Sequence, residues 1–512
     1  MPEKARTRLA LAGLSLSAFV AYLDFAIVNT ALPSMQRELT LTFVQLQWVM
    51  NIFVLALCIF MVNMGRFGDM FGRRLLLYIG LTCFAAASLL AGLAPNGQTL
   101  IAARAFQGVA ITMIVPSSVA LVSQTVSPSE RGRAIGIWTS VTGVGLAIGP
   151  VVGGLLTSAL SWRWIFFVNI PIVVIAFSLC FVSVRDAVKS NHEMRVDWAG
   201  FFLMIVGIGS LICAVVQGPE WGWASRPTLA LALTAVVSLG LLLVVESKVK
   251  SPILDLGLLA NRGFLAGAFA NFTLMGFAYS AFFLMPLYLR GIVGQEPYAI
   301  GFLMLPITVL IVIVAPIAGR MVDTKGAKLP VLLGLLSLAV SALIQSTLRD
   351  DSSLVHILLG FVFVGLGWGL VLSSAAFSAI SSLPPTLSGT ASGALWTFQN
   401  LGGSIGLAMT GTIFRHAERT SLMTGLGASD IHLTPEQQDL IKSLLGDSNE
   451  ARQILGEFPS SLAESIWPLF RNAFMQGYSW SFLFLLGLSL AAFLVVAVLM
   501  KNIARKEPPP SS

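Results

Sequence analysis

A single carboxylate, Asp24, lies in the otherwise apolar stretch AYLDFAIVNTALP, residues 21–33. The nearest charged residues are Arg8 and Arg37, so a helix with a rise of about 1.5 Å per residue places Asp24 roughly 20 Å or more from either. Desolvation favours its neutral form unless a cation or hydrogen-bond donors hold it ionised. Such a group can bind and release a proton, which makes Asp24 a candidate proton-binding residue. The alternative is a structural acid that is permanently protonated or bonded to Asn29.

A second ionisable group, Arg104, is the one Lys or Arg residue that lies inside an expected span and away from its first or last two residues. A cation in lipid needs a partner, so Arg104 is expected to tune the proton site or to neutralise a buried carboxylate. The alternative is that its long side chain reaches the outer interface, about two turns away.

The other reactive side chains form no catalytic pattern. No stretch combines paired histidines, a set of metal ligands or a serine with a suitable base. We therefore expect no enzyme activity, no metal and no bound cofactor. Four cysteines lie inside apolar stretches and are expected to pack as small apolar side chains: Cys58, Cys83, Cys180 and Cys213.

The composition explains where these groups must sit. Only 11% of the 512 residues are charged and 56% are hydrophobic, whereas soluble domains have about 25% charged residues. Apolar runs of about 20 residues recur, and each can cross a hydrocarbon layer about 30 Å thick as a helix. The predicted fold is an all-α integral membrane protein in a lipid bilayer, with fourteen transmembrane helices. The expected spans are 9–33, 45–65, 75–95, 98–122, 132–158, 164–184, 198–217, 228–246, 263–290, 299–319, 329–348, 354–380, 388–414 and 475–500.

The distribution of Lys and Arg predicts the orientation. With the N-terminus inside, twenty basic residues fall on the cytoplasmic side and ten on the other. Both termini are therefore expected in the cytoplasm, and the net charge of +7 reflects topology rather than nucleic-acid binding. Short connections suit a bacterial inner membrane, and we expect a monomer.

One long connection, 415–474, is expected outside the membrane. It contains TPEQQDLIKSLLG, in which Thr434 is a candidate N-cap, Pro435 suits the first helical position and Gln437 completes a capping box. This pattern predicts a short amphipathic helix. The segment is either a connector or a site for substrate access or a partner.

Two pairs of segments repeat within the chain. GRFGDMFGRR (65–74) matches GRMVDTKGAK (319–328) at an offset of 254 residues. GRAIGIWTSVTGVGLAIG (132–149) matches GTASGALWTFQNLGGSIG (389–406) at an offset of 257. The repeats predict two six-helix bundles, 1–190 and 256–512, with two further helices in 191–255. Parallel halves of this kind are typical of transporters that bind substrate between them.

Four motifs resemble those of the major facilitator superfamily. They are GRFGDMFGRR after the second span, RAFQGVAITMIVPSS (104–118) in the fourth, GVGLAIGPVVGG (143–154) in the fifth and LDFAIVNTALP (23–33) in the first. The last resembles the fourteen-span drug:proton antiporter branch. The resemblance implies a multidrug efflux antiporter that exports hydrophobic, cationic small molecules by alternating access, with the proton gradient as its energy source. Some members carry a further acid in the thirteenth span, where this chain has only Gln399 and Asn400.

The first motif predicts a conformational gate at the cytoplasmic mouth. Asp69 is expected near the start of the third span, where a carboxylate suits the positive end of a helix. It could form a charge cluster with Arg73, Arg74 and Arg131 that breaks in one state, or these residues could only anchor the topology. The glycines Gly65 and Gly72 shape the same loop.

The fifth-span motif predicts a tight helix contact. Gly145, Gly149, Gly153 and Gly154 are expected to line one face and to allow close approach of a neighbouring helix. Pro150 removes a backbone hydrogen bond and should bend the span. The contact is either plain packing or, as the resemblance implies, a seal between the halves against proton leak.

A drug-binding cavity should be apolar with a few polar groups. The candidates are polar or aromatic residues within spans: Asn29, Gln47, Asn51, Trp138, Tyr279, Trp368, Trp396, Gln399 and Asn400.

Two other functions remain open. The first is proton-coupled export of one defined metabolite, such as a lipid, siderophore or amino acid derivative, with Arg104 recognising an anionic group. The second, more remote, is a membrane receptor or enzyme.

Overall fold

The computed structural model describes residues 3–127, 130–184, 197–249, 256–383, 388–429 and 460–501. The regular elements in this part of the chain are helices, and thirteen of them are long and apolar enough to cross a membrane. A further long helix, α15, is rich in Gly, Ser and Thr and carries Gln399 and Asn400, so its hydropathy is lower. The all-α membrane fold is confirmed, and the count of fourteen is consistent with it.

The helices are grouped here as an N-terminal half, a central pair and a C-terminal half. The N-terminal half comprises α1 (Glu3–Glu38), α2 (Phe43–Phe71), α3 (Arg73–Gly92), α4 (Gly97–Thr125), α5 (Arg131–Ala159), α6 (Trp164–Phe167) and α7 (Asn169–Ser183). The central pair is α8 (Trp198–Trp221) and α9 (Arg226–Glu246). The C-terminal half comprises α10 (Leu256–Ala260), α11 (Arg262–Gly291), α12 (Pro297–Lys325), α13 (Lys328–Ser346), α14 (Leu354–Ser381), α15 (Ser388–Ala428) and α18 (Ser460–Leu499).

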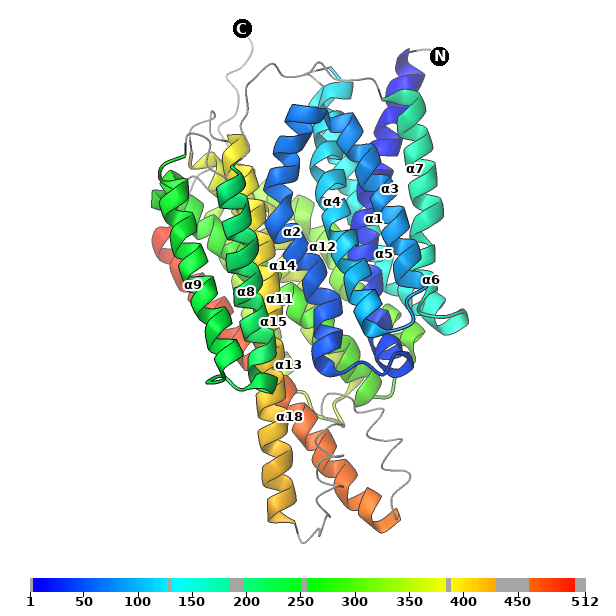
Figure 1. Ribbon diagram of the computed structural model, residues 1–512, viewed down its shortest axis with the longest axis vertical. Helices are drawn as coiled ribbons and strands as arrows, with labels where there is room; N and C mark the ends of the chain where they lie inside the picture. Colours follow the sequence, from blue (N-terminus) through cyan, green and yellow to red (C-terminus); the bar gives the residue numbers. More distant parts are fainter. Residues whose placement is uncertain are drawn as a thin grey trace.

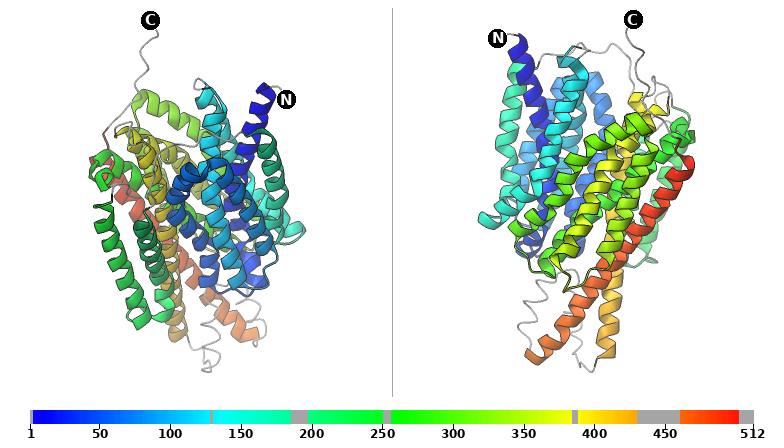
Figure 2. Two further views of the ribbon diagram at one scale, coloured as in Figure 1. Left: turned by 45° about the horizontal axis from the view of Figure 1, so that its top comes forward. Right: turned by 180° about the vertical axis from the view of Figure 1, so that it is seen from behind.

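The two halves lie side by side, with α8 and α9 on one flank (Figures 1 and 2). α8 packs against α2 of one half and α15 of the other through a shared apolar cluster that includes Cys58, Phe201 and Ala408. α1 and α15 begin on the upper side of Figure 1, which we call the proximal side. α15 ends and α18 begins on the opposite, distal side, where both project beyond the other helices.

The repeated loops have the same backbone turn. α2 and α12 each end at a glycine with positive φ, Gly72 at 102° and Gly326 at 81°. Side-chain-bearing residues rarely adopt this conformation, so both turns favour glycine. The two glycines are related by the offset of 254 residues. Asp69, by contrast, lies in the last turn of α2 and not near the start of α3. α2 continues six residues beyond the expected end of the second span at residue 65, and the predicted match of the Asp69 carboxylate to a positive helix end stays a prediction.

Helix ends depart from the expected spans at two other places. The sixth span is broken at Val168 into the short α6 and the longer α7. α15 continues into segment 415–474 as far as Ala428, and α18 begins within it at Ser460. A helix can continue beyond the apolar span because its backbone hydrogen bonds do not depend on the polarity of the side chains. An ion pair between Arg471 and Asp350 attaches α18 to the rest of the bundle about three turns after its start. The helix predicted at Thr434 lies outside the described residues.

Candidate functional site

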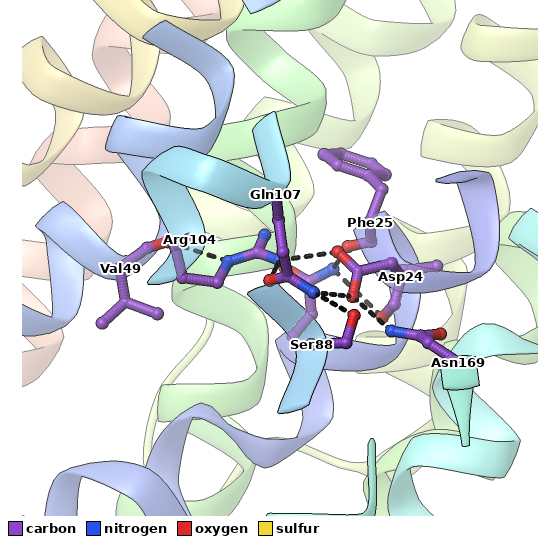
Figure 3. Close-up of polar contacts among 9 residues, drawn as sticks. Asp24, Phe25, Val49, Ser88, Arg104, Gln107 and Asn169 are labelled. Carbon is purple, nitrogen blue, oxygen red and sulfur yellow. Dashed lines mark hydrogen bonds and ion pairs between the residues drawn. The ribbon is translucent and has the colours of Figure 1, made fainter. Parts of the chain in front are cut away.

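The Asp24 carboxylate lies inside the N-terminal half with no exposed surface. Its Oδ2 accepts a hydrogen bond from Arg104 Nη1 of α4 at 2.6 Å. Its Oδ1 accepts from Gln107 Nε2 at 3.1 Å and from Asn169 Nδ2 of α7 at 2.8 Å. Figure 3 shows the three donors converging on the carboxylate from two helices. Together they form what we call the Asp24 cluster, which comprises Asp24, Ser88, Arg104, Gln107 and Asn169.

Arg104 is also fully buried, so the alternative that it reaches the outer interface is wrong. Its Nη1 donates to Gln107 Oε1 at 2.9 Å as well as to Asp24, and its Nε donates to the Val49 carbonyl at 3.3 Å. The guanidinium carbon lies 4.1 Å from the centroid of the Phe53 ring, a cation–π contact. The side chain turns inward because its counter-charge lies on the neighbouring helix α1.

Close helix contacts set this geometry. A Cβ on Gly108 would lie 2.7 Å from the Phe53 carbonyl oxygen, so the glycine lets α4 approach α2 and bring Arg104 to Val49. Arg104 and Gln107 are three residues apart and share one face of α4. Gln107 Nε2 also donates to Ser88 Oγ of α3 at 2.9 Å, which ties a further helix to the cluster.

Gln107 and Asn169 are site residues that the sequence analysis did not single out. Gln107 lies within the RAFQG motif, one turn after Arg104, and its position was the available signal. Asn169 is a lone amide in the apolar run before IPIVV. Asn29 does not bond to Asp24; its Nδ2 donates to the Phe25 and Ala26 carbonyls of its own helix at 2.9 and 3.1 Å. The alternative of an acid bonded to Asn29 is therefore wrong.

The ion pair and hydrogen bonds of the Asp24 cluster suit an ionised carboxylate at Asp24. A buried charge is tolerated when a counter-charge and further hydrogen bonds replace water, and Asp24 has both. The described residues contain no group of three His, Cys, Asp or Glu side chains that could hold a metal. What this arrangement can do chemically is hold, exchange and release a proton at one carboxylate.

The α5 glycines separate into two contacts. Gly145, Gly149 and Gly153 face α1, and a Cβ on Gly145 would lie 2.8 Å from the Phe19 carbonyl oxygen. Gly154 does not share this face: it meets the Pro297 backbone of α12, in the other half. Pro150, within α5, packs its backbone against Gly301 of α12. α5 is thus held between the helix that carries Asp24 and the opposite half.

Two cavity candidates, Gln47 and Asn51, lie in a buried contact between the halves. Gln47 Nε2 donates to the Leu407 carbonyl of α15 at 3.0 Å. Asn51 Oδ1 accepts from Ser404 Oγ of α15 at 2.5 Å. We call this contact, together with the weaker one from the Cys58 thiol to the Thr397 carbonyl, the α2–α15 seam.

The other cavity candidates are scattered. Trp138 donates to Ser118 within the N-terminal half at 3.2 Å. Tyr279 packs on Phe25 across the halves, with ring centroids 4.7 Å apart. The remaining candidates belong to the C-terminal half, where Trp368 and Asn400 are buried and Trp396 and Gln399 are half-buried.

The gate candidates are only partly visible. The side chains of Asp69 and Arg131 lie outside what the structure describes. Arg74 Nε donates to the Tyr78 hydroxyl at 3.0 Å, and Arg73 is half-buried beside it. A Cβ at Gly65 would meet no described atom within 4 Å apart from those of its own stretch of helix. The predicted charge cluster therefore stays a prediction.

The halves are joined toward the distal side. The Tyr298 backbone N–H near the start of α12 donates to Ser158 near the end of α5 at 3.1 Å. Gln47, one turn into α2, makes the seam bonds described above. These contacts place the join on the side where α15 and α18 project.

Comparison with known proteins gives a consistent picture. A model of the Major Facilitator Superfamily matches residues 14–407. The chain is 33% identical over 408 residues to the multidrug resistance protein Stp of Mycobacterium tuberculosis, covering 79% of this chain and 75% of Stp. It is 30% identical over 404 residues to the tetracenomycin C resistance and export protein of Streptomyces glaucescens, with the same coverages. A bacterial homologue of the human lysosomal transporter Spinster has a similar fold, with a TM-score of 0.66 at 14% identity, covering 96% of this chain and 98% of that structure.

Proposed function

The chain belongs to the major facilitator superfamily, and from this premise we propose that it is a multidrug efflux transporter that exchanges protons for hydrophobic, cationic small molecules. The observation that carries the proposal is the Asp24 cluster, a titratable carboxylate paired with a buried arginine inside one of two repeated halves. Its relatives named for resistance and export support outward transport of drugs. The family is one of transporters, and the chain is not an enzyme.

The proton couples to substrate through competition for one site. Asp24 takes up a proton from outside and releases it inward, while the substrate leaves in the opposite direction. Alternating access requires the halves to part on the distal side after the proximal side has closed. The energy source is the proton gradient, with no cofactor, and the transporting unit is a monomer.

The orientation follows from the basic residues. The proximal side, where α1 begins, faces the cytoplasm, and the distal side faces outward across a bacterial inner membrane. In this assignment the join between the halves closes the outside. The 65–74 loop, with Asp69 and the neighbouring arginines, then acts as the inner gate.

Reconstituted vesicles test the function. A pH gradient of either sign is imposed, and the fluxes of a cationic and an anionic dye of similar size are compared. We expect the cationic dye to move in the direction opposite to the flow of protons. The direction of dye movement should reverse when the pH gradient is reversed. Movement of the cationic dye that ignores the gradient would contradict proton coupling.

Replacing Arg104 by lysine is expected to lower the transport rate at least about tenfold. Lysine keeps the charge, but it lacks the planar fork that contacts Asp24, Gln107 and the Val49 carbonyl together, and a hydrogen bond to a charged group contributes about 1.5–3 kcal/mol. The matched control is Arg290→Lys, since Arg290 forms an ion pair near the surface with Glu296 and should transport normally. Normal rates in Arg104→Lys would show that the charge alone suffices.

A narrower substrate range is the second candidate function. One relative is named for a single compound, tetracenomycin C, and this name supports export of one defined metabolite as the second candidate. The dye comparison separates multidrug export from export of one metabolite. A metabolite exporter should move neither dye, although its Asp24 should still bind and release a proton as the pH changes.

A further inference from the structure

Asn169 contacts Asp24 from a break in the sixth span. It is the first residue of α7 and has no exposed surface, and its Nδ2 donates to Asp24 Oδ1 at 2.8 Å. α6 and α7 meet at Val168. We call residues 162–169, which contain this junction, the α6–α7 elbow. Figure 3 shows the Asn169 amide approaching Asp24 from the side opposite Arg104.

The elbow is anchored firmly to the surrounding helices. Trp162 is buried, and its Nε1 donates to Glu38 Oε2 at the end of α1 at 2.6 Å. Arg163 pairs with the same carboxylate at 3.3 Å, and its Nη2 donates to the Ala94 carbonyl at 3.2 Å. The Phe167 ring fills the space that a side chain at Gly92 would occupy. These contacts give the Asn169 amide a fixed place beside the carboxylate.

The three donors to Asp24 differ in what they can do when the acid is protonated. Arg104 has only donors. The Gln107 amide oxygen already accepts from Arg104 at 2.9 Å. The Asn169 Oδ1 has no hydrogen-bond partner among the described residues. Rotation of that amide would therefore offer an acceptor to a protonated Asp24, whereas the present orientation offers a donor to the ionised form.

We propose that Asn169 is a positioning residue that sets the pH at which Asp24 exchanges its proton. This inference rests on the proposed function of the same site and deepens it. Asn169 serves both protonation states, and its donation favours the ionised state in the distally joined conformation, because hydrogen bonds to a charged acceptor are about twice as strong as neutral ones.

The charged surroundings of Asp24 are simple. Among the described residues, Arg104 of α4 is the one charged side chain that contacts it. The basic residues of α3 lie in its first turn, far along the helix from Ser88, and α7 has no charged residue. The described part of α5 near α1 consists of small and apolar residues. Titratable side chains on α1 and on the helices that pack against it include Tyr22 of α1, the Cys180 thiol of α7, which contacts Ser17, and Tyr279 of α11, which packs on Phe25.

The test is a pair of matched substitutions read by infrared titration. Asn169→Leu removes both the donor and the acceptor at similar volume. Asn271→Leu makes the same change at a fully buried asparagine of α11 in the other half. The protonated carboxyl band is assigned to Asp24 by its loss in Asp24→Asn, and its pH midpoint is measured in the purified full-length protein.

The midpoint in Asn169→Leu is expected to rise by about one pH unit or more, because the ionised form loses a donor. Asn271→Leu should leave it unchanged. The pH profile of transport in vesicles should move by the same amount. If Asn169→Leu does not fold, Asn169→Asp keeps the shape and should raise the midpoint further, since two carboxylates sharing a site retain a proton.

An Asn169 variant whose midpoint is unchanged or lowered would overturn the inference. A shifted Asp24 band in a protein that shows no gradient-driven transport would instead refute the proposed function and leave the role of Asn169 standing. The two failures are therefore distinguishable.

Discussion

Asp24→Asn is expected to reduce gradient-driven transport to the level of protein-free vesicles. Asparagine is close in shape to aspartate but cannot bind or release a proton at neutral pH. It also leaves the Arg104 guanidinium, which has no exposed surface, without its counter-charge. The measurement is dye flux under an imposed pH gradient at several pH values. Uphill export that keeps its pH dependence in this variant would remove Asp24 from the mechanism.

Loss of folding must be separated from loss of coupling in this experiment. Removing one partner of a buried ion pair costs about 3–5 kcal/mol, whereas replacing both by apolar side chains is often neutral or stabilising. We therefore expect Arg104→Met alone to lower the melting temperature in detergent. The double variant Asp24→Leu/Arg104→Met should recover it and still fail to transport against a gradient. A double variant that is stable and coupled would show that the pair only supports the fold.

The sequence predicted the two charged members of the cluster and missed the two amides. Asp24 and Arg104 stand out because an unpaired charge in lipid is costly, so their presence in apolar stretches demands a partner. That they pair with each other was left open, because pairing depends on how α1 and α4 pack. Gln107 and Asn169 carry no charge, and a neutral amide in a span gives only a weak signal.

Helix periodicity explains what was right and wrong in α5. Residues four apart fall about 40° from one another around a helix, so Gly145, Gly149 and Gly153 were predicted correctly to share a face. Gly154 follows Gly153 by one residue and is turned by about 100°, which directs it to α12 instead. The same spacing argument, applied strictly, would have separated the two contacts.

Helix ends were less predictable than helix cores. Hydropathy falls where α15 acquires Arg415, His416 and Glu418, and the predicted span stopped at residue 414. The helix continues because its backbone bonds do not depend on lipid. The break at Val168 has a local signal that the expected spans did not use, because the polar Asn169 follows it directly and Pro171 lies in the first turn of α7. The elbow follows from tertiary contacts such as Trp162 with Glu38.

The internal repeat also shows that the two halves are not equivalent chemically. At the offset of 254 residues Asp24 corresponds to Ala278, and at 257 Arg104 corresponds to Phe361. The C-terminal half thus lacks both charges at the matching positions. This asymmetry supports coupling through a single intramembrane carboxylate in the N-terminal half.

A cross-link across the α2–α15 seam is expected to stop transport. The seam is antiparallel with a constant register: Asn51 meets Ser404, and Cys58 meets Thr397. Asn51 Oδ1 and Ser404 Oγ are 2.5 Å apart and belong to different halves, so cysteines at both positions can be joined by a short, reducible thiol-specific reagent. In a background without the four native cysteines, cross-linking should lower dye export to background, and reduction should restore it.

The matched control pair is Ser280→Cys/Thr410→Cys. These hydroxyls lie 2.9 Å apart and are fully buried, but α11 and α15 both belong to the C-terminal half. A bridge there joins helices that move together, so transport should continue. If the α2–α15 bridge forms and export also continues, the halves do not part along this seam. Opening of the seam would break the buried hydrogen bonds of Gln47 and Asn51. If the seam stays closed during export, the substrate would have to leave by separation of α5 from α12, where Gly154 meets Pro297.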